Sequence, residues 1–225
     1  MSSLHNDVEI VVSTTADGSV RASLGPDEQI NDTAMHDFLR RHHSDPARTV
    51  LLRLSYDTDD FCRYYQVAQP DAGAGLVRPQ RRTMDALVTR QSGVSLVLPI
   101  ADCIGAVLYH PPTHTLMLSH LGRHNLEQQG GSRSVAFLAR QGIDPSQLLV
   151  YLGPAAGRTH YPLFAFDNQS LHDVAQQQLT HAGVLKHHIT VDTRDTVTDP
   201  TFFSHSAALR GEKPHGRHAI VCRVR

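Results

Sequence analysis

The chain has 225 residues, of which 40% are apolar and 19% charged, and its net charge is −1 with the histidines neutral. A chain of this length can bury a substantial core without staples, so we expect residues 1–225 to form one domain. The balanced charge gives no general attraction to nucleic acid or to an anionic membrane. No segment approaches the roughly 20 apolar residues that a membrane span needs.

The three cysteines, Cys62, Cys103 and Cys222, are odd in number and widely spaced, which argues against a disulfide framework. The chain has no Cys-x-x-Cys pair, which excludes zinc-ribbon and thioredoxin-like motifs. Residues 1–12 lack the basic and then apolar pattern of a signal peptide. Reduced cysteines without an export signal predict a cytoplasmic protein.

The first third of the chain predicts strands with one helix among them. Residues 8–13 read as a strand, and residues 31–43 read as a helix because Met35, Phe38 and Leu39 recur at helical spacing. Two further strands are predicted at 49–55 and 62–67. The stretch from 70 to 82 is rich in Gly, Pro and Arg and is expected to be a surface loop.

The middle of the chain predicts a buried strand followed by a hairpin. The apolar run at 94–100 follows a glycine and suits a buried strand. The apolar runs at 104–109 and 115–119 flank a His-Pro-Pro-Thr turn, which is typical of a hairpin.

The last third mixes helices and strands without a regular alternation. The predicted elements are helices at 132–141 and 168–182 and strands at 147–152, 188–191 and 218–224. This order predicts an α+β fold with a mixed β-sheet core flanked by helices.

The predicted hairpin brings together two residues that could carry chemistry, Cys103 and His120, which lie at the outer ends of its strands. A histidine can support a cysteine as a thiolate nucleophile, or both can bind zinc. Structural roles in the core are the alternative for each. His124 follows His120 by four residues and would share its face of a helix; His160 and His205 are weaker candidates for a third ligand.

Several motifs occur in a fixed order: Gln66-Val67, Met-Asp-Ala-Leu-Val-Thr at 84–89, Ala-Asp-Cys at 101–103 and Ser-His-Leu-Gly at 119–122. With the looser Gly-Pro-Ala at 153–155, Phe-Phe-Ser at 202–204 and Gly-Arg at 216–217, they cover about residues 60 to 225. This order resembles the YfiH-like family, also called laccase-domain or multicopper polyphenol oxidoreductase proteins and, in some bacteria, peptidoglycan editing factors.

The resemblance implies an α+β domain with a mixed sheet and a zinc site of two histidines and one cysteine. It also implies phosphorolysis of adenosine, inosine or methylthioadenosine, with adenosine deamination as a companion activity. Nucleoside and phosphate would then be the small-molecule partners. The copper-oxidase label ranks last, because the histidines do not form the repeated His-x-His pairs that such sites usually need.

The chain departs from the family pattern at the site itself. The family's first histidine falls at Ala68, so one zinc ligand is missing unless another residue such as His124 replaces it. Arg123 starts an Arg-His-Asn segment where the family has Trp-Arg-Gly, and it is the predicted substrate-binding residue for phosphate. Ser-His-Ser-Ala at 204–207 replaces the family's Ser-Tyr-Arg-Arg.

Three hypotheses about function follow. The first is a divergent zinc-dependent purine nucleoside phosphorylase-like enzyme in which Cys103 and His120 are both catalytic residues and metal ligands, with His124 as a further ligand. The second is a catalytically impaired family member that acts as a binding or regulatory protein. The third is a metal-free Cys-His hydrolase.

Overall fold

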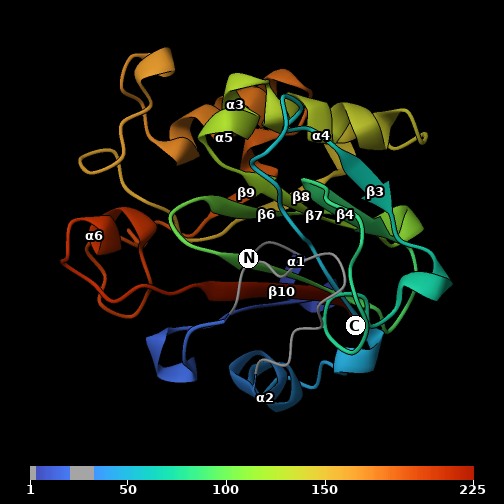
Figure 1. Cartoon of the computed structure of the whole chain (residues 1–225). Helices are drawn as coiled ribbons and strands as arrows, with labels where there is room; N and C mark the ends of the chain where they lie inside the picture. Colours follow the sequence, from blue (N-terminus) through green and yellow to red (C-terminus); the bar gives the residue numbers. More distant parts are fainter. Residues whose placement is uncertain (1–3, 21–32) are drawn as a thin grey trace.

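Two mixed β-sheets form the centre of the computed structural model, which describes residues 4–20 and 33–225 (Figure 1). The four-stranded sheet has the order β1 (Val8–Val12), β10 (His218–Val224), β5 (Ser95–Ile100) and β2 (Thr49–Leu51). In this sheet β2 runs parallel to β5, and the other neighbours are antiparallel.

The second sheet has six strands, with the hairpin near its middle. Its order is β3 (Tyr64–Gln66), β4 (Ala86–Thr89), β7 (Thr115–Leu121), β6 (Ile104–His110), β8 (Leu149–Leu152) and β9 (Ile189–Val191). The two outer pairs, β3 with β4 and β8 with β9, are parallel, whereas the inner pairs are antiparallel.

Helices cover the outer face of each sheet (Figure 1). The six-stranded sheet carries α3 (Arg123–Glu127), α4 (Gly130–Ala139) and α5 (Leu171–His181), and the four-stranded sheet carries α2 (Thr33–Arg41). Two short helices complete the set, α1 (Leu4–Asp7) and α6 (His205–Leu209). The prediction of an α+β fold with mixed strands flanked by helices is confirmed, with the difference that the core contains two sheets.

The space between the sheets is filled by apolar side chains of both. Leu96 and Leu98 of β5 meet Leu116 and Leu118 of β7 in one fully buried cluster. Because side chains of a strand alternate between its faces, Met117 instead faces the helices. His120 follows Leu118 by two positions on β7, so its side chain also points into the space between the sheets.

Helix α5 shows how local sequence sets the helix ends. Ser170 caps its N-terminus: the Ser170 hydroxyl accepts from the Asp173 N–H at 3.1 Å, and the Asp173 carboxylate accepts from the Ser170 N–H at 3.3 Å. The helix begins at Leu171 for this reason, and its buried face carries Val174 and Leu179 as the apolar spacing predicts.

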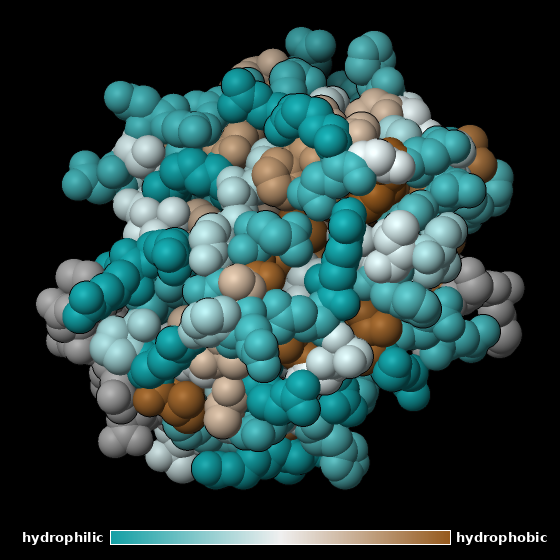
Figure 2. Space-filling model, turned by 90° about the vertical axis from the view of Figure 1, so that its right-hand side faces the viewer, coloured by the Kyte–Doolittle hydropathy of each residue, from teal (hydrophilic) through white to brown (hydrophobic). Residues whose placement is uncertain are grey.

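One face of the molecule is largely polar. Figure 2 shows one face on which hydrophilic residues predominate and apolar residues occupy small separate areas. None of the helices in residues 4–20 and 33–225 combines the length and the apolar character that crossing a bilayer requires.

Candidate functional site

A cavity of about 560 Å³ lies at one end of the space between the two sheets. Its walls come from the end of β5 at Ile100, from the turn that leads into β6, from the end of β7 with the start of α3, and from the residue that precedes β10. The lining residues with reactive or charged groups include Cys103, His120, Arg123, His124, His205 and Arg217.

Cys103 and His120 meet in this cavity because the predicted hairpin forms. β6 and β7 pair antiparallel, with Ile104 opposite Leu121 and Gly105 opposite His120. A Cβ atom built on Gly122 would lie 2.8 Å from the Cys103 Sγ and 3.1 Å from the His120 Nε2. The thiol and the imidazole nitrogen therefore flank one small space, which stays open because residue 122 has no side chain.

Both groups are held in their neutral forms. Burial raises the pKa of the Cys103 thiol to about 12, and the Asp102 charge adds to this, whereas Arg217 and Arg123 partly oppose it. Burial lowers the pKa of the His120 imidazole to about 4. At neutral pH the site thus holds a thiol and a neutral imidazole, the reverse of the thiolate–imidazolium pair of cysteine nucleophiles.

The pair has the properties of an incomplete zinc-binding donor set. The His120 Nε2 is buried and has no hydrogen-bond partner, which is costly for a polar atom unless another group binds it. Sulfur and imidazole nitrogen are ordinary zinc ligands, and protein zinc sites use three or four ligands. In the part of the chain that the structure describes, no three His, Cys, Asp or Glu side chains gather as a metal site.

His124 lines the cavity, but the structure does not gather it with the pair. Its ring stacks on Phe61 with 4.7 Å between the ring centroids, and its Nδ1 lies 3.8 Å from the Glu127 carboxylate. His205 lines the cavity from the exposed start of α6, and the Nδ1 of His160 lies 3.9 Å from the Asp195 carboxylate.

Ala68, where the resemblance places the family's first histidine, does not line the cavity with Cys103 and His120. Gln66 of β3 pairs with Val88, and Val88 pairs with Met117, three residues before His120. Ala68 lies two residues beyond the end of β3, on the side away from His120. The segment that does reach the cavity here is Leu54 to Tyr56, which follows β2.

Asp102 fixes the turn that presents Cys103. Its φ of 75° lies in the left-handed region, which is uncommon for a residue with a side chain. The buried carboxylate accepts from the Thr196 hydroxyl at 3.0 Å and from the Ser206 N–H at 2.7 Å, and the Asp102 carbonyl accepts from the Ala156 N–H at 2.8 Å. Three distant segments thus hold a strained turn in place. The Ala-Asp-Cys motif at 101–103 was identified from the sequence, but this role of Asp102 was not predicted.

Two arginines add positive charge beside the thiol. Arg123 begins α3 and lines the cavity, and among the described residues its side chain has no hydrogen bond or ion pair. Arg217 lines the cavity from the other sheet, and its Nη1 donates to the carbonyl of the adjacent Gly216 at 2.8 Å. Guanidinium groups without a carboxylate partner in a cavity are suited to bind an anion. Arg217 was not predicted as a site residue, although the Gly-Arg motif contains it.

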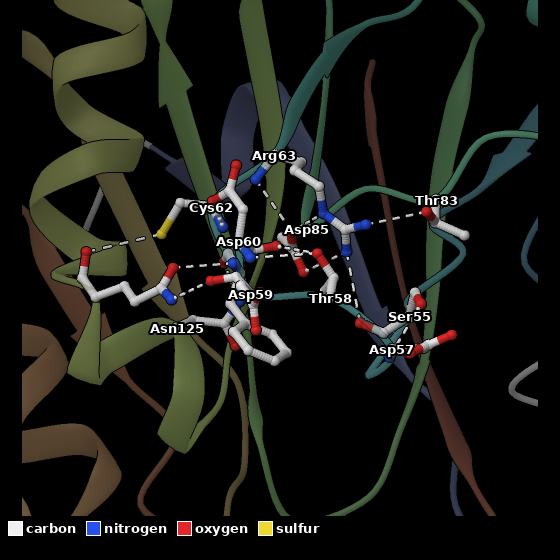
Figure 3. A network of polar contacts seen from close by, with 12 residues as sticks. Ser55, Asp57, Thr58, Asp59, Asp60, Cys62, Arg63, Thr83, Asp85 and Asn125 are labelled. Atoms are coloured by element: carbon white, nitrogen blue, oxygen red, sulfur yellow. Dashed lines mark hydrogen bonds and ion pairs between the residues drawn. The ribbon is translucent and has the colours of Figure 1, made fainter.

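A network of polar contacts holds the loop from 55 to 63, whose first two residues, Ser55 and Tyr56, line the cavity (Figure 3). The Asn125 amide donates to the Phe61 carbonyl at 2.6 Å, which ties the loop to α3. The Arg63 guanidinium pairs with Asp85 at 2.9 Å, which ties it to the residue before β4. The loop is thereby attached both to α3 and to the residue that precedes β4.

A comparison with known families finds one match. Residues 45–169 and 165–225 match the model of the family described as multi-copper polyphenol oxidoreductase laccase. The chain belongs to this family.

Curated relatives carry the name purine nucleoside phosphorylase. One from Streptomyces coelicolor is 33% identical over 111 residues, which are 49% of this chain and 42% of the relative. Another from Xylella fastidiosa is 30% identical over 176 residues, 68% of this chain and 64% of the relative. The chain thus spans less than two thirds of the length of either relative.

Solved structures share the whole fold at low identity. The hypothetical protein YfiH from Bacillus licheniformis superposes with a TM-score of 0.81 at 19% identity and covers 99% of this chain and 94% of its own. YlmD from Geobacillus stearothermophilus has a TM-score of 0.79 at 21% identity, with 97% and 92% covered. These likenesses establish the fold.

Proposed function

We propose that the chain catalyses phosphorolysis of a purine nucleoside such as adenosine, inosine or methylthioadenosine in this cavity. In this reaction phosphate attacks the anomeric carbon of the ribose, the bond to the purine nitrogen breaks, and a ribose phosphate and the free base are released. The observation that carries the proposal is that Cys103, His120, Arg123 and Arg217 converge in one cavity. Its volume of about 560 Å³ suits a small molecule of this size, and the names of the relatives supply the reaction class.

Arg123 and Arg217 are the proposed phosphate-binding residues. Both lie near enough to the Cys103 thiol to lower its pKa, so their charges act on the same small volume. Holding the anion between two guanidinium groups would orient its attacking oxygen and offset its charge. The ribose would then lie over Gly122, where the site is open.

Cys103 and His120 are the proposed zinc ligands of this site. Zinc, when bound there, supplies a Lewis acid and favours the deprotonated form of the thiol. The unpartnered His120 Nε2 and the protonated Cys103 thiol support this role, because each gains a partner on binding the metal. His124 remains the predicted third ligand, and it would have to leave its stack on Phe61 to serve.

The two alternative hypotheses make different demands on the same residues. A metal-free Cys-His hydrolase needs a thiolate, which the raised pKa of Cys103 disfavours. A catalytically impaired family member would keep the cavity and bind nucleoside without turnover. The test below separates all three.

The test measures zinc per chain by elemental mass spectrometry and phosphate-dependent release of free base from adenosine and inosine. We expect about one zinc per chain in the wild type and the loss of both zinc and turnover in Cys103→Ala. Cys62→Ala is the matched control, because Cys62 lies outside the cavity and should keep both. His124→Ala tests the third ligand, and inosine formed from adenosine without phosphate reports deamination.

Other results would point elsewhere. Zinc-loaded protein that binds nucleoside but releases no base would overturn the enzymatic proposal and leave the binding role. Turnover that persists without zinc and is abolished by thiol alkylation would instead favour metal-free cysteine chemistry.

A further inference from the structure

Two tyrosines line the cavity in addition to the groups discussed above. Tyr56 lies in the loop after β2, and Tyr161 lies in the loop between β8 and α5. Tyr161 is half-buried and packs against the apolar cluster beneath the helices, so its position is fixed. Tyr56 is 65% exposed, so packing constrains it less than it constrains Tyr161.

Both phenol groups lie close to Cys103 and to one another. Burial is the main cause that raises the pKa of each tyrosine, and the Cys103 charge is the next. The Tyr161 charge also contributes at Tyr56. Tyr56, Tyr161 and Cys103 thus line one and the same cavity.

Neither hydroxyl is used by the fold. Among the described residues, no hydrogen bond is made by the Tyr56 or the Tyr161 hydroxyl. The polar lining groups Asp102 and Asn125, by contrast, are fully engaged with backbone or side chains of the protein. The cavity thus offers a flat ligand two tyrosine rings, beside the aliphatic side chains of Leu54, Pro99 and Ile100.

We infer that Tyr56 and Tyr161 bind the planar base of the ligand by stacking, with Tyr161 as the fixed platform and Tyr56 as the cover that closes over it. Aromatic side chains bind bases through ring faces, which every base presents. This inference rests on the proposed function, since it assigns the base to the tyrosines and leaves the phosphate to the arginines. Both tyrosines are specificity-determining residues in this assignment.

The absence of tryptophan from the chain provides a direct probe. Tyr56→Trp introduces a single tryptophan at the mouth of the cavity. We expect adenosine to quench its fluorescence saturably, whereas ribose 5-phosphate, which has no base, should not. Tyr65→Trp on β3 is the matched control outside the cavity, and it should show no saturable quenching.

Calorimetric binding measures the contribution of each ring. We expect Tyr56→Ala to weaken adenosine binding about tenfold or more, Tyr56→Phe to weaken it less than about threefold, and ribose 5-phosphate binding to stay unchanged in both. Tyr161→Leu keeps apolar packing against the core and removes the flat ring, so it should show the same loss as Tyr56→Ala if it folds. Tyr161→Phe should bind as the wild type does.

The outcomes separate this inference from the proposed function. If Tyr56→Ala and Tyr161→Leu bind adenosine as tightly as the wild type, the tyrosine assignment is overturned while phosphorolysis stands. If the wild type binds adenosine through these rings but releases no base, phosphorolysis falls and the tyrosine assignment holds. If the wild type binds none of adenosine, inosine and methylthioadenosine, both are overturned.

Discussion

At the scale of single residues, the site depends on what is missing at one position as much as on what is present. Gly122 has φ of −101°, a conformation open to any residue, so its glycine is not required by the backbone. What the glycine provides is room beside Sγ and Nε2, since a Cβ there would crowd both atoms. A side chain at residue 122 is therefore compatible with the backbone conformation but not with the open space in the site.

Gly122→Ala is expected to leave the fold intact and impair the site. The added methyl group would occupy the space between Cys103 and His120, so zinc per chain and turnover should each fall by about tenfold or more, and the overpacking should lower the free energy of unfolding by about 1–3 kcal/mol. Gly142→Ala is the control: it should also lower stability, because Gly142 has φ of +83°, but it should keep zinc and turnover, because the added methyl group points into open space. Equal zinc content in Gly122→Ala and the wild type would contradict this account.

Some residues of the site could be predicted from the sequence, and others could not. The Ala-Asp-Cys and Ser-His motifs identified Cys103 and His120, because a hairpin is a local structure whose ends must meet. The place of Ala68 relative to this pair could not be predicted in the same way, because a strand's register depends on its partner strands as well as on its own residues. Arg217 and Tyr161 reach the cavity through long-range packing, for which the sequence has no local signal.

At the scale of elements, β10 lies between β1 and β5 in the four-stranded sheet, and it begins beside the cavity. Its first residue, His218, is buried opposite Ile100 and near Phe202. Burial lowers the pKa of His218 from 6.5 to about 4. The unfolded chain thus binds a proton at His218 at pH values where the folded chain does not.

The expected consequence is a loss of stability in acid. His218 costs no stability above about pH 6.5, and it lowers the free energy of unfolding progressively as the pH falls toward 4, by up to about 3 kcal/mol. Urea denaturation at several pH values should show a shallower acid decline in His218→Gln than in the wild type. His181→Gln, at an exposed position of α5, is the control and should follow the wild type. An unchanged pH dependence in His218→Gln would argue against the buried neutral histidine.

Elements were predictable from the sequence where their pattern is local and strong. The β10 bounds of 218–224 were predicted in full, and the hairpin and the helices α2, α4 and α5 were found with shifted ends. The five-residue α3 was not predicted, because Gly122 reads as a helix breaker and here precedes the first helical residue. β2 ends at Leu51, earlier than predicted, because the chain then leaves the sheet to form the cavity wall.

At the scale of the whole molecule, the division into two sheets was beyond the sequence, because it depends on pairings between distant segments. β10 pairs with β1 and with β5, which lie far away in the chain. The cavity likewise draws on segments spread from Leu54 to Arg217. It exists only when both sheets are packed, so a ligand that binds there binds the folded state alone.

Inorganic phosphate should therefore stabilise the whole molecule. If Arg123 and Arg217 bind it, millimolar phosphate should raise the thermal unfolding midpoint by a few degrees. Arg217→Met should reduce this rise, whereas Arg140→Met at the exposed end of α4 should keep it. Sulfate and chloride at equal ionic strength distinguish binding from general salt effects. An equal rise in Arg217→Met and the wild type would remove Arg217 from the phosphate site.

The pairing of β1 with β10 also determines how the protein can be attached to a surface. Val8 lies opposite Val224, and the Arg225 N–H donates to the Asp7 carbonyl at 2.9 Å, so the two segments emerge side by side. Arg217, at the other end of the same strand, faces the cavity roughly 25 Å away. A linker attached beside either segment would thus anchor the protein on a sensor surface with its cavity turned toward the solution.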